Sequence, residues 1–173
     1  MEVQRPPDPA LLVMGVLSSS KEAISEAESK TEYIFGPLLR KTDPEIFEGF
    51  TCYYEKEMGP DLLRSFWVFT EPIVRAALVE AKLSTNRIER EMSIGGRRTV
   101  NLDPGLLSLE SLVLATTKPY SHRIYLSKGI YGELSYMFRR DGGIDLLQWT
   151  YPDYRKSVVM DFFSGIRKEV LLT

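Results

Sequence analysis

A continuous apolar run, Ala10-Leu-Leu-Val-Met-Gly-Val-Leu17, is the feature that most limits how this chain can fold. It has the length of a strand that is buried on both faces. It is too short to span a bilayer, and Gly15 interrupts it. The chain has 173 residues, of which 43% are hydrophobic, enough for one core around such a strand. We therefore expect a single domain over residues 10–173, preceded by a polar, proline-rich tail at residues 1–9.

The residues after this run predict a helix and then a β-hairpin. Ser19-Ser-Lys-Glu22 has the form of a capping box, and the helix that it opens should end at Gly36-Pro37. Strands are expected over residues 50–57 and 62–69 because both segments are rich in aromatic and apolar residues. Gly59-Pro60-Asp61 lies between them and is typical of a tight turn.

A second helix and a further strand complete this first unit. Thr70 can cap the helix, with Pro72 tolerated in its first turn. Apolar residues at helical spacing mark the buried face of the helix: Ile73, Val74, Ala77, Leu78 and Ala81. The strand Arg98–Asp103 follows, and Pro104-Gly105 should end it. The order β-α-β-β-α-β is the pattern of ferredoxin-like folds, so we predict an α+β protein with a ferredoxin-like βαββαβ core.

The rest of the chain is expected to extend the same sheet as an added antiparallel hairpin region. The candidate strands cover residues 109–116, 123–127, 132–139 and 144–149, and the first of these segments also allows a helix. A C-terminal helix should begin near Pro152-Asp153 and bury Val158, Val159, Phe162, Phe163, Ile166 and Val170.

The strand Arg98–Asp103 carries the first candidate site. Its apolar positions alternate with Thr99, Asn101 and Asp103, so these three polar side chains share one face. A rigid strand holds such side chains in fixed positions, which suits a binding site. An ordinary solvated strand face followed by an Asp-Pro-Gly turn explains the same pattern.

A second candidate lies in the predicted strand at residues 50–57. Alternation places Glu55 and Glu57 on one face, where two carboxylates can hold a divalent cation or act as acid and base. The same alternation is ordinary for a sheet with one face in solvent, so both carboxylates can equally be surface groups.

The segment from Thr116 to Arg123 combines hydroxyl groups, Lys118, the single histidine and a guanidinium within eight positions. Such donors suit the recognition of phosphate or carboxylate. His122 is either a hydrogen-bonded structural residue or, beside Lys118 and Arg123, a neutral base.

Two further segments contain polar or aromatic clusters. Trp149, Tyr151 and Tyr154 surround Pro152 at the start of the last helix, where they either stack on a ligand ring or simply pack. Thr150 or Asp153 is the expected N-cap of that helix. In the segment 84–89, Glu89 is expected at the surface.

Composition and motifs exclude several classes of protein. The net charge of −2 gives no general attraction to DNA or to anionic membranes. One histidine and one cysteine cannot form a zinc site of the Cys/His kind, and no Gly-x-x-x-x-Gly-Lys-[Ser/Thr] loop occurs. The single Cys52 fits a buried structural thiol in a reducing cytoplasm. Residues 94–173 hold 11 basic and 8 acidic groups, against 11 and 16 in residues 1–93, so an anion should favour the C-terminal half.

Together the motifs resemble one prokaryotic family described as a domain of unknown function, some members of which carry the label GTP-binding protein. The matching segments are Thr51–Gly59, Thr85-Asn86 with Glu89, Arg98–Gly105, Val113–Lys118, His122–Leu126 and Trp149–Tyr154. The resemblance covers nearly the whole chain after Pro9, although Leu106 stands where members often carry an aromatic residue. It implies no activity or catalytic residues, and the usual GTP phosphate loop is absent.

The leading hypothesis is a cytoplasmic protein that binds a small anionic ligand, a nucleotide or phosphate ester, and that could act as a metal-assisted hydrolase or transferase. The expected ligand-binding residues are Arg98, Asn101, Thr117, Lys118, Arg123, Trp149 and Tyr151. The expected catalytic residues are His122, Asp103 and Glu55, and the two carboxylates are also the candidate ligands for Mg²⁺. The alternative is a non-catalytic module that contacts a protein or RNA.

Overall fold

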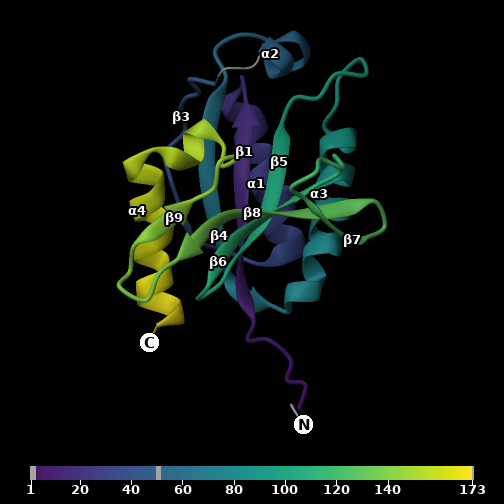
Figure 1. The fold of residues 1–173 in the computed structure, drawn as a ribbon. Coiled ribbons are helices and arrows are strands. Elements are labelled where there is room, and N and C mark those ends of the chain that lie inside the picture. Colours follow the sequence, from purple (N-terminus) through teal and green to yellow (C-terminus); the bar gives the residue numbers. More distant parts are fainter. Residues whose placement is uncertain (1–2, 50–51, 173) are drawn as a thin grey trace.

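The computed structural model describes residues 3–49 and 52–172 of the chain (Figure 1). The strands are β1 (Ala10–Ser18), β2 (Leu38–Lys41), β3 (Glu45–Ile46), β4 (Leu63–Ile73), β5 (Asn101–Leu107), β6 (Ser111–Thr116), β7 (Ile124–Ser127), β8 (Ile130–Phe138) and β9 (Ile144–Leu146). The helices are α1 (Lys21–Phe35), α2 (Cys52–Met58), α3 (Leu78–Glu91) and α4 (Ser157–Ile166), with short helical turns η1 (Arg75–Ala77), η2 (Pro152–Arg155) and η3 (Arg167–Leu171). None of the helices in these described ranges is long and apolar enough to cross a membrane.

All the strands join one antiparallel sheet in the order β2-β4-β1-β5-β6-β8-β7. Two short strands lie beside this path, because β3 pairs with β4 and β9 pairs with β8. The apolar run at the start of the chain forms β1, which pairs with β4 on one side and β5 on the other. Every residue of β1 is buried, so the prediction of a buried strand is confirmed.

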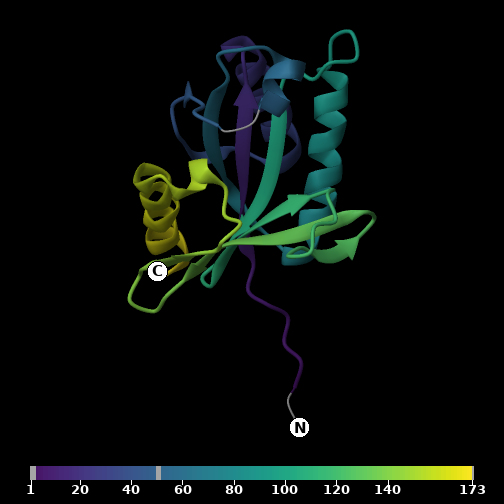
Figure 2. The same ribbon diagram turned by 45° about the horizontal axis from the view of Figure 1, so that its top comes forward.

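Helices cover both faces of the sheet around β1. Alternate β1 residues Leu12, Met14 and Val16 join the apolar cluster that includes side chains of α1 and α3. The intervening residues Leu11 and Val13 join a second cluster with side chains of α4. In Figures 1 and 2, α3 and α4 accordingly lie on opposite sides of β1. Because successive side chains of a strand point to opposite faces, one strand contributes to both clusters.

The segment predicted as the strand 50–57 is instead the helix α2 from Cys52 onward, so the predicted hairpin with residues 62–69 is wrong. Tyr54 and Met58 are four residues apart and pack in one small cluster with Leu17 and Leu62. Residues four apart lie on the same face of a helix, so this contact is consistent with α2. The short alternation of apolar residues, which predicts a strand, is not the pattern that the structure follows. Residues 50 and 51 and the side chain of Cys52 lie outside the described part, so the expectation of a buried thiol is untested.

Two other predicted element ends are wrong. β4 continues to Ile73, so Thr70 caps no helix, and α3 begins only at Leu78. β5 continues through Pro104 to Leu107 instead of ending at Asp103. The backbone of Leu102 faces away from β1, and strand alternation turns Pro104 in the same direction. β6 pairs with β5 only from Gly105 onward, so the missing N–H of Pro104 costs no ladder hydrogen bond.

The C-terminal half follows the sequence closely. β6 to β9 occupy the four predicted strand segments, and the predicted C-terminal helix is present as η2 and α4. Val159, Phe163 and Ile166 are buried and Phe162 is half-buried, whereas Val158 and Val170 are exposed, so the prediction is wrong for these two valines. Neither Thr150 nor Asp153 caps this helix, because no side-chain cap bond is found at η2 or α4. The molecule is therefore a mixed α and β protein with an antiparallel sheet and a C-terminal helix.

Candidate functional site

A cavity of about 590 Å³ lies where β5 and β6 separate. β6 pairs with β5 only along Gly105–Leu107, so the first residues of β5 have no strand beside them on that edge. Asn101 and Asp103 line the cavity from β5, and Thr116, Thr117 and Lys118 line it from the end of β6 and the loop beyond. Side chains of α2, α3, β4, β8 and η2 complete the wall.

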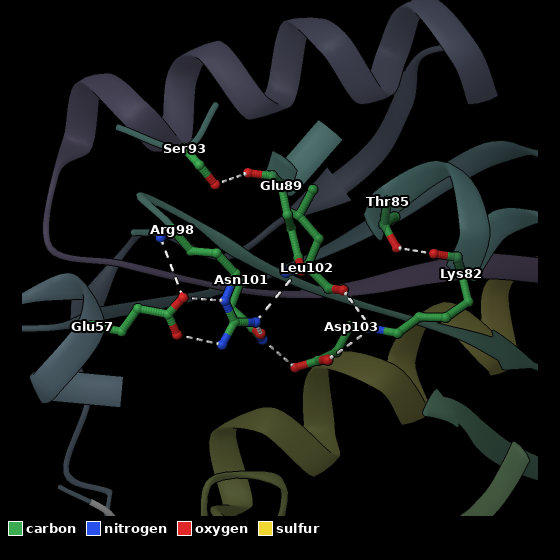
Figure 3. Close-up of polar contacts among 9 residues, drawn as sticks. All are labelled: Glu57, Lys82, Thr85, Glu89, Ser93, Arg98, Asn101, Leu102 and Asp103. Atoms are coloured by element: carbon green, nitrogen blue, oxygen red, sulfur yellow. Dashed lines mark hydrogen bonds and ion pairs between the residues drawn. The ribbon is translucent and has the colours of Figure 1, made fainter. Parts of the chain in front are cut away.

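Helix α3 covers the open edge of β5 with two charged side chains (Figure 3). The Lys82 ammonium donates to the carbonyl of Leu102 at 3.1 Å, and a carboxylate oxygen of Glu89 accepts from the Leu102 N–H at 2.6 Å. These bonds replace those that a neighbouring strand would make. Burial raises the pKa of Glu89, whose side chain is 8% exposed. The expectation that Glu89 is a surface residue is wrong.

A chain of polar contacts runs along the β5 side of the cavity (Figure 3). Glu57 of α2 accepts from the Arg98 guanidinium at 2.7 and 3.0 Å, and this contact lowers the pKa of Glu57. Arg98 also donates to the side-chain oxygen of Asn101 at 2.8 Å. The Asn101 amide donates to Asp103 at 2.6 Å, and Lys82 lies 3.4 Å from the other oxygen of Asp103. Each side chain is thereby fixed by its neighbour.

A second polar cluster is built around Glu133 of β8. One oxygen of its carboxylate accepts from Arg123 Nε at 2.6 Å and lies 2.8 Å from His122 Nε2. Arg123 further donates to the Lys118 carbonyl and the Tyr151 hydroxyl, both at 3.1 Å. Arg123 and Glu133 are both buried, so this cluster is a rigid part of the wall.

A third group lies on β4 and η2. Arg64 donates through Nε to Asp153 at 2.7 Å, and the two side chains are only 12% and 9% exposed. The guanidinium also lies near the rings of Phe47, Phe66 and Tyr154, at 5.3 to 6.0 Å from their centroids. Arg64, Asp153 and Tyr154 all line the cavity.

The described lining has more cationic than anionic side chains. The cations are Arg64, Lys82, Arg90, Arg98, Lys118 and Arg123, and the carboxylates are Glu89, Asp103, Glu133 and Asp153. Five tyrosines also line the cavity: Tyr53, Tyr54, Tyr120, Tyr151 and Tyr154. Two of the cations make cation–π contacts with these rings. Lys118 Nζ lies 4.9 Å from the Tyr53 ring centroid, and Arg123 Cζ lies 4.4 Å from the Tyr120 ring centroid. Such a surface can hold an anion beside an aromatic ring.

The fold brings most of the residues predicted from the sequence into this one cavity. The predicted residues that line it are Arg98, Asn101, Asp103, Thr117, Lys118, Arg123 and Tyr151. Glu55 is absent from the lining and is exposed on α2, because the helix separates it from the polar face that a strand would have given it. His122 contacts Glu133 and stacks on Trp149 with ring centroids 4.7 Å apart, and neither ring belongs to the lining. In the described ranges, no three Asp, Glu, His or Cys residues lie close enough to hold a metal ion.

Several lining residues are not among those predicted from the sequence. Lys82, Asn86 and Glu89 recur at intervals of four and three residues on α3, a polar stripe at helical spacing that could have been recognised. Arg64 and Glu133 are single charged residues within strands, and nothing in their neighbourhood indicates that they are buried. Asp153 follows a proline at a helix start, a pattern that predicts only a helix cap.

Comparison with known proteins identifies a family without an activity. The family model described as "Domain of unknown function (DUF4416)" matches residues 8–169, almost the whole chain. No curated protein and no solved structure matches the chain.

Proposed function

The chain belongs to DUF4416, a family whose description names no activity, and we propose that its cavity binds a small anionic ligand, a nucleotide or another phosphate ester. The observation that carries this proposal is the cation excess of the cavity in a chain whose net charge is −2. A volume of about 590 Å³ is within the range of small-molecule sites. The tyrosines in the wall offer surfaces on which a base or sugar can stack.

In this proposal Lys118, Arg98 and Arg123 form the cationic side of the site, as expected from the sequence. Arg98 and Arg123 are held by Glu57 and Glu133, so they meet the ligand already oriented. Asp103 is the carboxylate best placed to act on a bound ligand, because its side chain is 30% exposed and lines the cavity. Hydrolase or transferase chemistry with Mg²⁺ remains a prediction that builds on binding.

We also infer that the first part of the chain is a ferredoxin-like core. The strand order β2-β4-β1-β5, with antiparallel neighbours, supports this assignment. The helix α1 connects β1 to β2, and α3 connects β4 to β5, as the βαββαβ pattern requires. The second strand of the pattern is then β2, and not the segment at residues 50–57.

Thermal shift with nucleotides, sugar phosphates and inorganic phosphate, each with and without Mg²⁺, tests the proposed function. A ligand that binds only the folded state stabilises it and so raises the melting temperature. At a ligand concentration of about 100 times the dissociation constant, the added stability is about 2.7 kcal/mol. Lys118→Ala should reduce the shift, Asp103→Asn should reduce only the part of the shift that depends on Mg²⁺, and the surface variant Lys30→Ala is the control. Equal shifts in all variants, or no shift for any compound, would contradict the assignment.

A protein-interaction role is the second candidate, and one observation favours it. β7 is the last strand of the sheet, and its Ile124, Tyr125 and Leu126 are exposed. An edge strand with apolar side chains can accept a further strand from a partner. If Ile124→Lys abolishes capture of a partner protein while the ligand panel gives no shift, this role replaces the first.

A further inference from the structure

Three buried side-chain atoms of the described residues have no hydrogen-bond partner, and all three belong to residues that line the cavity. They are Nη1 of Arg64, the hydroxyl oxygen of Tyr154 and Oε1 of Glu133. A buried polar group without a partner destabilises the folded state, so proteins rarely keep one without a reason. Because all three belong to residues around one cavity, a ligand bound there is the candidate partner for them.

Two of these atoms are hydrogen-bond donors that converge above Gly15 of β1. A Cβ atom on Gly15 would lie 2.7 Å from the Tyr154 hydroxyl and 3.4 Å from Arg64 Nη1. Both donors are held in place by other contacts. Arg64 is hydrogen-bonded to Asp153 through Nε, and the Tyr154 ring packs against Phe66 and Phe163. A guanidinium and a hydroxyl in fixed positions form a cradle for an oxyanion.

The third atom is an acceptor. Arg123 and His122 both contact Oε2 of Glu133, which leaves Oε1 as the unpartnered oxygen of a carboxylate that is only 2% exposed. Glu133 faces Leu114 across the β6–β8 pair, and Leu114 also lines the cavity. A buried carboxylate oxygen in this position requires an N–H or O–H donor.

From these contacts, and resting on the proposed function, we propose that the ligand carries an amino group as well as an oxyanion. Together with the cations Lys118, Arg98 and Arg123 of the proposed site, Arg64 and Tyr154 bind the phosphate or carboxylate, and Glu133 binds the amino group. The site thus binds both the oxyanion and the amino group of an amine-bearing anionic metabolite. A ligand that lacks the amino group leaves the Glu133 oxygen unpartnered and binds more weakly.

The test uses ω-aminoalkyl phosphates with chains of two to six carbons and n-alkyl phosphates of the same lengths. Isothermal titration calorimetry compares the wild type with Glu133→Gln, Tyr154→Phe and the surface control Arg139→Gln. For at least one chain length, the amine should strengthen binding to the wild type about tenfold or more. The Glu133→Gln amide keeps an acceptor for Arg123 but turns its NH₂ toward the ligand, so this gain should be lost.

Tyr154→Phe separates a role in binding from a role in folding. It removes only the unpartnered hydroxyl, so the melting temperature without ligand should stay the same or rise. Binding of both phosphate series should nevertheless weaken several-fold. A fall in melting temperature with unchanged affinity would overturn the oxyanion cradle.

The outcomes distinguish this inference from the proposed function. Alkyl phosphates that bind through Tyr154 but gain nothing from the amine at any length would overturn the role of Glu133 and leave the anion site standing. Absence of binding by both series, with and without Mg²⁺, would overturn this inference, whereas the proposed function falls only if the nucleotide and sugar phosphate panel also gives no thermal shift.

Discussion

At the scale of single residues, Gly15 shows how one absent side chain makes room for the side chains of Tyr154 and Arg64. Its neighbours in space are the Tyr154 hydroxyl and Arg64 Nη1, and a Cβ atom would lie too close to the first of them. Gly15→Ala should therefore destabilise the protein by about 1–3 kcal/mol through overpacking, and it should weaken phosphate binding at least tenfold. Urea unfolding and calorimetry with an alkyl phosphate measure the two effects.

Gly165→Ala is a matched control for this substitution. Gly165 lies in α4, and nothing approaches the position of its Cβ within 4 Å. Alanine in a helix interior is favoured over glycine by about 1 kcal/mol, so this variant should be more stable with unchanged affinity. Identical behaviour of the two alanine variants would contradict the close approach at Gly15.

The residue scale also explains which parts of the site the sequence could reveal. Lys118 and Arg123 lie in a loop dense in polar groups, which indicates a site without any knowledge of the fold. Arg64 and Glu133 are isolated charges in strands, where solvent exposure is the ordinary expectation. Their burial depends on side chains from distant elements, and local sequence carries no signal of it.

At the scale of elements, the contact between α3 and β5 gives a pH-dependent prediction. Burial raises the pKa of Glu89 above its ordinary value of 4.5. A carboxyl group whose pKa is raised by folding contributes stability that is complete below its unfolded pKa and is lost as the pH rises through the raised value. From pH 4.5 upward, the free energy of unfolding of the wild type should therefore fall relative to that of Glu89→Gln, whose amide does not titrate.

The measurement is urea unfolding at several pH values, read as the difference between wild type and variant. Taking the difference removes groups with the opposite sign, such as Glu57, whose pKa is lowered by Arg98. Glu26→Gln changes an exposed carboxyl of α1 and should give no such trend. A difference that is flat with pH would show that the Glu89 carboxyl is not buried between α3 and β5.

Helices and strands are predictable where the apolar pattern extends over many residues, and not where it covers only a few. β1 and α4 carry patterns that only one structure satisfies, and both were predicted. The segment that forms α2 has only seven helical residues, and its Tyr53-Tyr54 pair suits a strand as well. β2 is largely exposed and only four residues long, so its position depends on pairing with β4 and not on its own sequence.

At the scale of the whole molecule, the cavity is shared between halves of opposite charge. The C-terminal half is the more basic, which predicts that an anion binds there. The lining takes three cations from each half instead: Arg64, Lys82 and Arg90 from the first, and Arg98, Lys118 and Arg123 from the second. Composition alone indicates the sign of a charge imbalance, but only the antiparallel pairing of β1 with both β4 and β5 brings these groups together.

Because both halves form the wall, a bound ligand should slow hydrogen exchange in segments that are far apart in the sequence. The clearest pair is α2 and the loop at residues 117–123, which meet where Lys118 lies over Tyr53. Saturation with an alkyl phosphate should protect amides in both segments, since opening either one releases the ligand. The turn at residues 139–143 lies outside the lining and serves as the internal control. Protection confined to one of the two segments would mean that the ligand does not bridge the halves, and the anion would then be bound by one cluster alone.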